Sequence, residues 1–413
     1  HQNTLSVRYL LPLPADGAVS GFSFTIGNNK VIGEIDRKVK ARERYEKAVL
    51  DGHTAALVEQ QRSSVFEQHV GNIPPGASVV CEVIVDQPLM WIDGGQWEWR
   101  FPTVVGARYM GTPGRVVDAD AIHVKASNKP LPVTAELELV IGDTVTAPAA
   151  SPSHSIRTND VRGAHRVELA TGARLDRDIV VRWGVAKPEP GVSIDCARPA
   201  GDGHHGASYG LLTLVPPTGT SHKAVARDLI VLIDTSGSMS GQPLVQAKRM
   251  VTALIDSLGD ADRLELIEFS SRPRRWKDEP IAATRDGKRA ASKWVSKLSA
   301  SGGTEMTQGI MEAMKTLRPG SQRQVLLITD GYIGFEAEII EAVVHRLPTS
   351  CRMHTLGIGS GANRTLTRCV ARAGGGVEVL LGIGEDVEPS ILSLIHISEP
   401  TRQRDSSRMP SSA

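Results

Sequence analysis

Residues 227–240 read RDLIVLIDTSGSMS, and this stretch decides the fold of the C-terminal part of the chain. Its apolar run, Leu229–Ile233, has no polar alternation and stops at Asp234. Such a run is typical of a strand buried on both faces of a parallel sheet. Asp234, Ser236 and Ser238 follow at the carboxyl end of the strand, which is the edge of an open α/β sheet where ligands bind. Their side chains offer only hard oxygen atoms, which favours Mg²⁺ or Mn²⁺ over zinc.

The chain from residue 226 to 392 alternates apolar runs with amphipathic stretches. Between Pro243 and Leu258, apolar residues recur at i, i+3, i+4 and i+7, which predicts a helix. Further strands are predicted at 264–270, 324–330, 352–360 and 377–381, an edge strand at 274–277, and helices at 285–298, 304–317, 336–347 and 364–373. This order predicts a doubly wound, Rossmann-like α/β domain with a mostly parallel sheet.

Two more oxygen ligands are expected at the same edge of this sheet. Thr304 begins a predicted helix after Gly302 and Gly303, and Asp330 ends the predicted strand 324–330. Because carboxyl ends of parallel strands meet at one edge of a sheet, both side chains should lie beside Asp234. A doubly wound fold would therefore bring three separate segments together at this edge.

These three segments resemble a known motif. DTSGS (234–238), SGGTEM (301–306) and ITDG (328–331) together resemble the metal-ion-dependent adhesion site, or MIDAS, of von Willebrand factor type A (VWA) domains. The resemblance extends over roughly Asp228 to Ser390. The simpler alternative is a tight turn followed by a helix cap, since Ser, Thr and Asp favour those positions in any protein.

The resemblance implies a division of roles among the five residues. Ser236, Ser238 and Thr304 would bind the metal directly, and Asp234 and Asp330 would act mostly through water. Neutral hydroxyl ligands leave most of the charge of the cation uncompensated, and Mg²⁺ tends to keep bound waters. An Asp or Glu carboxylate of a partner protein could replace one of those waters. The resemblance therefore implies a Mg²⁺ (or Mn²⁺) site that docks a protein ligand.

The first hundred residues read as strands broken by turns, with a charge-rich helix expected at Glu34–Leu50. Three blocks in order, at 9–24, 56–85 and 99–110, resemble the VIT domain, named for vault proteins and inter-alpha-trypsin inhibitor heavy chains. The resemblance covers residues 1–111 and implies a β-sandwich interaction module without a catalytic set. The opening strands of the family are missing, so we expect truncation at the N-terminus.

Two further segments complete the expected organisation. Residues 112–220 are rich in Pro, Ala, Gly and Ser and contain several short alternating strands, which predicts a β-rich connecting region. Residues 393–413 lack periodicity, and SLIHISEPTR (393–402) resembles the translation of a sequencing-library adapter. We therefore expect 226–392 to be the VWA-like domain, truncated at its end, and 393–413 to be a non-native, disordered tail.

Composition limits the classes of partner. The chain has 413 residues, a formal net charge of +1 and 23% charged residues, so a basic nucleic-acid-binding face is not expected. No apolar run reaches the length of a membrane-spanning helix. The four cysteines show neither a zinc pattern nor the density of a disulfide scaffold, which leaves the redox compartment open.

Enzymatic alternatives match the sequence poorly. Asp234 ends a strand as in aspartate-based phosphatases, but Ser236 stands where that chemistry needs a second Asp. SGSMSG is not G-x-S-x-G, and GIGSG (357–361) is not G-x-G-x-x-G. A metal-dependent hydrolase needs a general base, for which Glu305 is the one obvious candidate.

Three functions are therefore kept. The first is a non-enzymatic, metal-dependent protein-binding or adhesion protein, secreted or attached to the cell envelope, because bacterial surface proteins share the VIT–VWA layout. The second is an intracellular scaffold, like the vault-associated proteins with the same pair of domains. The third, least favoured, is a metal-dependent hydrolase.

Overall fold

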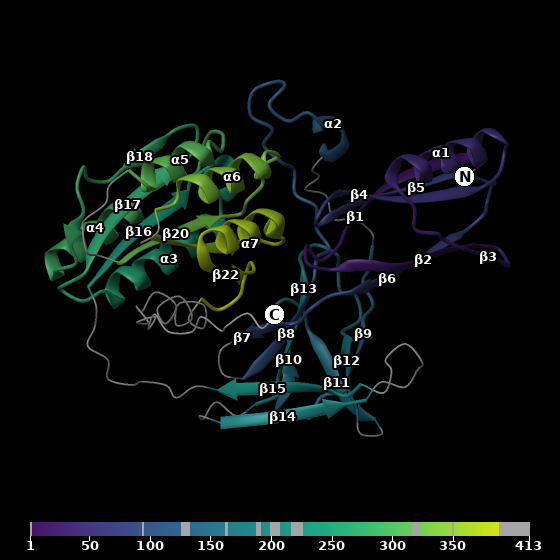
Figure 1. Cartoon of the computed structure of the whole chain (residues 1–413), viewed down its shortest axis with the longest axis horizontal. Coiled ribbons are helices and arrows are strands. Elements are labelled where there is room, and N and C mark those ends of the chain that lie inside the picture. The colour runs from purple at the N-terminus through teal and green to yellow at the C-terminus, as the bar shows by residue number, and fades with distance from the viewer. Residues whose placement is uncertain are drawn as a thin grey trace, which may run out of the picture.

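The computed structural model describes residues 2–92, 95–124, 133–161, 164–186, 191–198, 207–215, 226–315, 322–348 and 351–387. We refer to residues 2–86 as the N-terminal domain, to 90–215 as the middle region and to 226–387 as the C-terminal domain. Figure 1 shows the C-terminal domain, green to yellow, on one side of the N-terminal domain, in purple, with the teal strands of the middle region below their junction. The predicted tail, 393–413, lies outside the described residues.

The C-terminal domain is built on the predicted sheet. Its strand order is β18-β17-β16-β20-β21-β22, with the short β19 also pairing with β17. The strands are β16 (Arg227–Asp234), β17 (Arg263–Phe269), β18 (Pro273–Arg275), β19 (Ile281–Ala282), β20 (Gln322–Thr329), β21 (Cys351–Ile358) and β22 (Gly375–Leu381). All neighbouring strands from β17 to β22 run parallel, and β18 and β19 pair antiparallel with β17.

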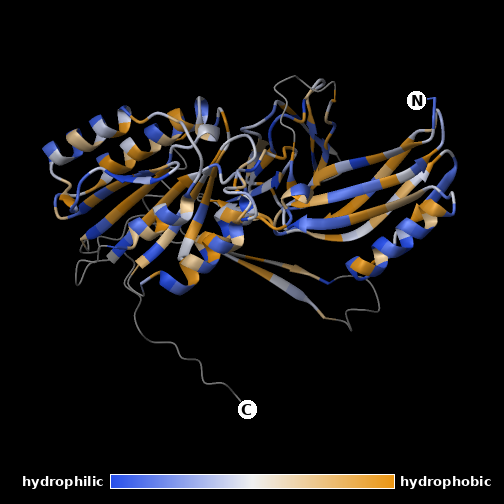
Figure 2. Cartoon of the chain, turned by 90° about the horizontal axis from the view of Figure 1, so that it is seen from above, coloured by the Kyte–Doolittle hydropathy of each residue, from blue (hydrophilic) through white to orange (hydrophobic). Residues whose placement is uncertain are grey.

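Helices cover both faces of this sheet, as expected for a doubly wound domain. After the short 3₁₀ turn η2 (Gly237–Met239), the helices are α3 (Gln242–Ser257), α4 (Arg285–Ser296), α5 (Met306–Ala313), α6 (Glu336–Arg346) and α7 (Arg364–Ala373). Val231 and Ile233 of β16 pack in the core under α3 and α4, whereas Ile230 and Leu232 pack under α5, α6 and α7. In Figure 2 the strands of this sheet are mostly orange and the helices are banded blue and orange. The predicted fold class is confirmed.

The N-terminal domain consists of two three-stranded antiparallel sheets and one helix. The sheets have the orders β1-β5-β4 and β3-β2-β6. The elements are β1 (Leu5–Pro12), β2 (Ala18–Ile26), β3 (Asn29–Ile32), α1 (Lys38–Leu50), β4 (Ala55–Arg62), β5 (Val65–Ile73) and β6 (Val79–Asp86). The helix begins at Lys38 rather than at the expected Glu34. Ile35 precedes the helix and is exposed, as is Val39 in its first turn.

The middle region forms further antiparallel sheets. Their strands are β7 (Met90–Ile92), β8 (Gln96–Phe101), β9 (Glu138–Ile141), β10 (Ala147–Ala150), β11 (Ile156–Val161), β12 (Ala164–Leu169), β13 (Ile179–Gly184), β14 (Gly191–Ala197) and β15 (Tyr209–Val215). The sheet order β10-β13-β8-β7 joins strands from both sides of residue 111. One sheet therefore extends across the domain boundary that was expected at residue 111. The reason is that Trp97 and Trp99 pack with Val181 and Trp183 of β13.

β8 presents two different faces to its surroundings. Trp97 and Trp99 are partly buried in the core of the middle region, as expected. The intervening Glu98 and Arg100 are also buried, and they form an ion pair with an N–O distance of 2.8 Å. Arg182 of β13 extends this cluster to the C-terminal domain, where its guanidinium lies 3.0 Å from the carboxylate of Glu385. Charged groups therefore bridge the middle region and the C-terminal domain.

A long segment after β8 leaves the middle region and packs on the C-terminal domain. We call residues 102–122 the connecting segment; it ends in the short helix α2 (Ala119–Ile122). Val116 and Ile122 are buried in the same core cluster as Ile333 and Phe335 of the C-terminal domain. The segment therefore belongs to that domain by packing, although the sequence places it more than a hundred residues earlier.

The structure also bears on membrane-spanning helices and on the state of the cysteines. No helix within the described ranges is long and apolar enough to cross a membrane. All four cysteines are free thiols, and Cys81 and Cys196 are exposed.

Candidate metal centre

Asp234 is the last residue of β16 and is fully buried at the carboxyl edge of the sheet. Its Oδ1 accepts the backbone N–H of Ser236 at 2.8 Å, and its Oδ2 accepts the hydroxyl of Thr329 at 2.6 Å. The next hydroxyls also lie together, because the Oγ atoms of Ser236 and Ser238 are 3.2 Å apart. The turn after β16 thus fixes the carboxylate and gathers two hydroxyl oxygens at one point.

Asp330 follows β20, the parallel neighbour of β16, and is buried as well. Its Oδ1 accepts the backbone N–H of Tyr332 at 3.1 Å, whereas its Oδ2 is buried without any hydrogen-bond partner. Gly331 adopts φ = +71°, a conformation in which a side chain would be strained, and this allows the chain to turn directly after the carboxylate. Asn363 holds the turn by donating to the Gly331 carbonyl at 2.9 Å.

Thr304 lies in the loop before α5 and is buried. Two backbone hydrogen bonds join this loop to the turn after β16: Gly237 N–H to the Gly302 carbonyl, 3.1 Å, and Ser301 N–H to the Thr235 carbonyl, 2.8 Å. Gly302 has φ = +80°. The three segments that carry the predicted ligands are therefore neighbours at one edge of the sheet, and Thr304 lies two residues before α5 rather than in its first turn.

The two carboxylates lie in an environment that disfavours their charge. Burial raises the pKa of Asp234, and the charge of Asp330 raises it further. Burial also raises the pKa of Asp330, which the nearby Ser238 hydroxyl opposes. Within the described ranges, neither aspartate forms an ion pair with a lysine, arginine or histidine. Among the described residues, the pair thus has no positively charged partner.

Comparisons with known proteins match two parts of the chain to domain families. A family model described as the Vault protein inter-alpha-trypsin domain matches residues 1–85, and one described as the von Willebrand factor type A domain matches residues 227–379. The chain carries a VIT domain and a VWA domain.

Several curated relatives align with most of this chain. Mouse von Willebrand factor A domain-containing protein 5A is 26% identical over 91% of this chain and 50% of its own length. Mouse protein mono-ADP-ribosyltransferase PARP4 is 25% identical over 90% of this chain but only 19% of its own. Mouse inter alpha-trypsin inhibitor heavy chain 4 is 24% identical over 78% of this chain and 34% of its own. The chain spans half or less of each relative.

The donor set of the VWA domain fits a hard divalent cation. The buried Asp330 Oδ2 has an unused acceptor site, and the Asp234–Asp330 pair needs positive charge. The surrounding side chains supply oxygen atoms alone, which suits Mg²⁺ or Mn²⁺. A simple helix cap would explain neither the orphaned oxygen nor the two buried, mutually repelling carboxylates. The residues present therefore fit the predicted group.

Glu305, the candidate general base of a hydrolase, is engaged elsewhere. Arg115 of the connecting segment donates to both of its carboxylate oxygens, at 2.9 and 3.1 Å. The hydroxyl of Tyr109 lies 3.4 Å from the same carboxylate. Both oxygens of this carboxylate are therefore occupied by a contact with another part of the chain. The position next to Thr304 is thus used for docking the connecting segment.

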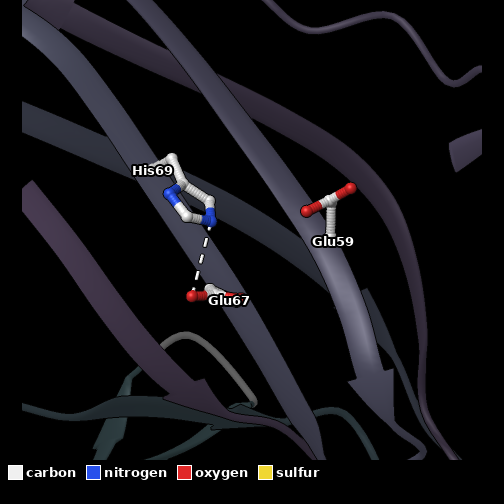
Figure 3. A group of neighbouring side chains, drawn as sticks. All are labelled: Glu59, Glu67 and His69. Atoms are coloured by element: carbon white, nitrogen blue, oxygen red, sulfur yellow. Dashed lines mark ion pairs between the residues drawn. The ribbon is translucent and has the colours of Figure 1, made fainter. Parts of the chain in front are cut away.

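The VIT domain contains a second cluster of potential ligands, shown in Figure 3. Glu59 of β4 lies opposite Glu67 of β5, and a ring nitrogen of His69 lies 3.4 Å from Glu67. Ligand atoms of these three residues lie within 4.8 Å of one another. However, Arg42 pairs with Glu59 and Arg8 pairs with Glu67. Both carboxylates are neutralised by side chains, so this cluster does not require a cation.

The sequence did not indicate the side chains that support the candidate metal centre. Thr329 was seen as the end of a strand, yet its hydroxyl bonds Asp234 and accepts the N–H of Gly331 at 2.8 Å. Asn363 was placed just before a helix, yet it holds the Asp330 loop. A polar residue at the end of an otherwise apolar run, as in LLIT before Asp330, was the available signal.

Proposed function

We propose that this chain is a non-enzymatic protein-binding protein that docks a partner carboxylate through a divalent cation at its VWA domain. The observation that carries the proposal is the buried Asp330 Oδ2, which has no hydrogen-bond partner beside a second buried carboxylate. Buried carboxylates without basic partners are costly, and a bound cation removes that cost. VWA domains often bind a divalent metal, which supports the same reading.

The five predicted residues divide into two groups in this proposal. Ser236, Ser238 and Thr304 would hold the cation through their hydroxyl oxygens, and Asp234 and Asp330 would provide the balancing negative charge. When bound, Mg²⁺ or Mn²⁺ supplies positive charge and an exchangeable coordination position. The exposed Ser238 marks the side from which a partner Asp or Glu could approach. The site is therefore suited to capture a protein ligand from solvent.

The hydrolase alternative receives less support. Its candidate base, Glu305, is held by Arg115 rather than directed at the predicted ligands. The competing scaffold hypothesis differs in location rather than in chemistry. We propose a secreted or envelope-associated protein, with a cytoplasmic scaffold as the alternative. Fractionation of cells that express the gene from its native start codon separates these two locations.

Calorimetric titration of the full chain with Mg²⁺ and with Mn²⁺ tests the metal centre. We expect wild-type protein to bind one equivalent and Ser236→Ala to bind at least tenfold more weakly, because a hydroxyl oxygen is lost. Ser240→Ala is the matched control, since Ser240 is an exposed hydroxyl just beyond the same turn. Equal heats for all three proteins would contradict the proposal.

Docking of a carboxylate is tested separately. A displayed library of peptides that contain one central Asp or Glu is selected on the Mg²⁺-loaded chain. We expect enriched peptides to lose binding in EDTA, and also when the acidic residue is changed to Asn or Gln. Enrichment that survives both changes would show that the partner is recognised in another way.

A further inference from the structure

We infer that Arg115 and Tyr109 of the connecting segment are positioning residues for the metal site, so that the site reaches its full cation affinity only when this segment is docked. The inference rests on the proposed cation site and concerns how the site is regulated. Both residues lie outside the range 227–379 that matches the VWA family. The segment nevertheless contacts each of the two loops that carry Thr304 and Asp330.

The first contact reaches the residue next to Thr304. Arg115 makes a bidentate pair with Glu338, through Nε and Nη2, with distances of 3.0 and 2.7 Å. Its remaining nitrogen, Nη1, donates to both carboxylate oxygens of Glu305, at 2.9 and 3.1 Å, and its guanidinium carbon lies 3.6 Å from the centre of the Phe335 ring. A bidentate pair fixes the orientation of the guanidinium, and this in turn fixes the direction of the bonds from Nη1 to Glu305. The backbone that carries Thr304 is therefore tied to the connecting segment through Glu305.

Close packing supports the same contact. A side chain at Gly303 would come within 2.8 Å of the ring and hydroxyl of Tyr109. Glycine at this position thus lets the aromatic ring of the connecting segment lie directly against the loop before Thr304. Tyr109 is only partly buried there. A displacement of the segment would open this side of the loop.

The second contact reaches the loop of Asp330. Tyr109 donates its N–H to the Tyr332 carbonyl at 2.8 Å and accepts the N–H of Gly334 at 3.0 Å, as an added strand would. Tyr332 is the same residue whose N–H binds the Asp330 carboxylate. A single residue therefore links Asp330 to the connecting segment.

A third path runs through buried side chains. Arg108 of the connecting segment pairs with the buried Glu336, which also accepts a hydrogen bond from Asn363 at 3.1 Å. Asn363 in turn binds the carbonyl of Gly331 and donates its N–H to the Asp330 carbonyl at 3.0 Å. These contacts form a continuous chain of polar groups behind the predicted ligand.

The VIT domain holds the other side of the connecting segment. Arg62, at the end of β4, forms a bidentate pair with Asp118, and Arg8 of β1 donates to the Ala121 carbonyl at 3.1 Å. The order of contacts is thus VIT domain, connecting segment, metal-site loops. Because coupling between two sites is reciprocal, occupancy of the metal site should in turn stabilise the docked segment.

The double variant Arg115→Gln/Glu305→Gln of the full chain tests the inference, because it breaks the tie without changing net charge. Groups that orient metal ligands typically account for 10–100-fold in affinity. We expect Mg²⁺ affinity by calorimetry to fall about tenfold, and Arg115→Lys, which keeps an ion pair with Glu305, to stay within about threefold of wild type. Arg182→Gln/Glu385→Gln is the control, since it removes another link between the middle region and the VWA domain.

Hydrogen exchange provides a readout that loss of folding alone would not mimic. Saturating Mg²⁺ should slow exchange of residues 104–122 in wild type, and not in the double variant. If the double variant binds Mg²⁺ as wild type does, the inference falls and the proposed cation site stands. If wild type shows no Mg²⁺ binding at all, both fall. A loss of affinity as large in the Arg182/Glu385 control would also overturn the inference.

Discussion

The VIT and VWA domains each bury two carboxylates close together, but they surround them with different neighbours. Glu59 and Glu67 lie opposite each other on adjacent strands, and each pairs with an arginine. Asp234 ends β16 and Asp330 follows the adjacent parallel strand β20, and within the described ranges they receive only hydroxyl and amide donors. A buried anion must be neutralised in both places. The first domain carries its positive charge in the chain, whereas in the described part of the second domain no basic side chain pairs with either aspartate.

The two carboxylate pairs are equally buried and differ in whether arginines neutralise them. Glu59, Glu67, Asp234 and Asp330 are all at most 4% exposed, so exposure alone does not distinguish the pairs. What distinguishes them is that one carboxylate oxygen of Asp330 has no donor. Proximity of acidic and histidine side chains alone would favour the VIT cluster as a metal site. The charge balance points to the VWA site instead.

The largest expected effect comes from removing the charge at Asp330. Asp330→Asn should lower Mg²⁺ affinity at least 100-fold, which is about 2.7 kcal/mol at about 1.36 kcal/mol per factor of ten. Isothermal titration measures it. Asp286→Asn, which neutralises an exposed carboxylate in the first turn of α4, is the control and should bind as wild type. If Asp330→Asn bound Mg²⁺ as tightly as wild type, the aspartate pair would not differ from the glutamate pair in needing a cation.

The next largest effect is expected when an arginine that neutralises one of the buried VIT glutamates is removed. Arg42→Met should destabilise the VIT domain by about 2 kcal/mol, because Glu59 is left buried without its cation, and the partly exposed position of Arg42 limits the loss. Urea unfolding followed by hydrogen exchange in β4 and β5 measures it. Arg44 lies on the same helix as Arg42. Arg44→Met removes an exposed ion pair with Glu34, which precedes the helix, and should have no measurable effect on stability.

A smaller effect is expected from a variant that removes both arginines from the VIT cluster and so makes it able to bind a metal ion. In Arg8→Met/Arg42→Met, the ligand atoms of Glu59, Glu67 and His69 remain within 4.8 Å of one another and lose both positive partners. A mixed nitrogen and carboxylate set suits zinc. We expect the variant to gain Zn²⁺ affinity at least tenfold over wild type, measured by competition with a chromogenic chelator. A further His69→Gln change should abolish the gain, and no gain would mean that charge balance is not what excludes the metal.

The smallest effect is a difference in pH dependence between the domains. Burial raises the pKa of Asp234 and Asp330 in the metal-free VWA domain, so its folded state binds more protons than the unfolded chain. Its stability should therefore fall as the pH rises from about 4 toward neutrality, and Mg²⁺ should remove this slope. Asp330→Asn should flatten the slope in EDTA.

The VIT domain should respond in the opposite direction. Burial and the nearby Arg42 and Arg8 lower the pKa of His69, so its neutral form is favoured by folding. The stability that this contributes is present above about pH 6.5 and is lost as the pH falls through the lowered folded pKa. Hydrogen exchange in β5 between pH 5 and pH 7 measures it, with His69→Gln as the comparison. Parallel pH responses in both domains would contradict this assignment.

Much of the VWA domain could be predicted because its elements have strong local signals. β16 is a continuous apolar run, and α3 shows the full helical period with Pro243 in its first turn. The site residues were predictable because they occur at ends of such elements. Topology then brings Asp234 and Asp330 together, which requires only that their strands be parallel neighbours.

The rest depended on contacts that leave no periodic signal. The connecting segment is rich in glycine and irregular in structure, and its docking depends on Tyr109 and Arg115 meeting partners two hundred residues away. The burial of Glu98 and Arg100 on β8 requires a second domain to cover them, and no periodic pattern in the sequence indicates that cover.

The burial of Val116 and Ile122 in the core of the VWA domain has a practical consequence for work on its parts. A fragment that begins at Arg227 would keep all five predicted ligands and still lack two core side chains. Ile333 and Phe335 would then face solvent, which favours self-association. Supplying residues 102–122 as a separate peptide should restore the missing surface. The VWA domain is thus a candidate for fragment complementation, with the connecting segment as the smaller fragment.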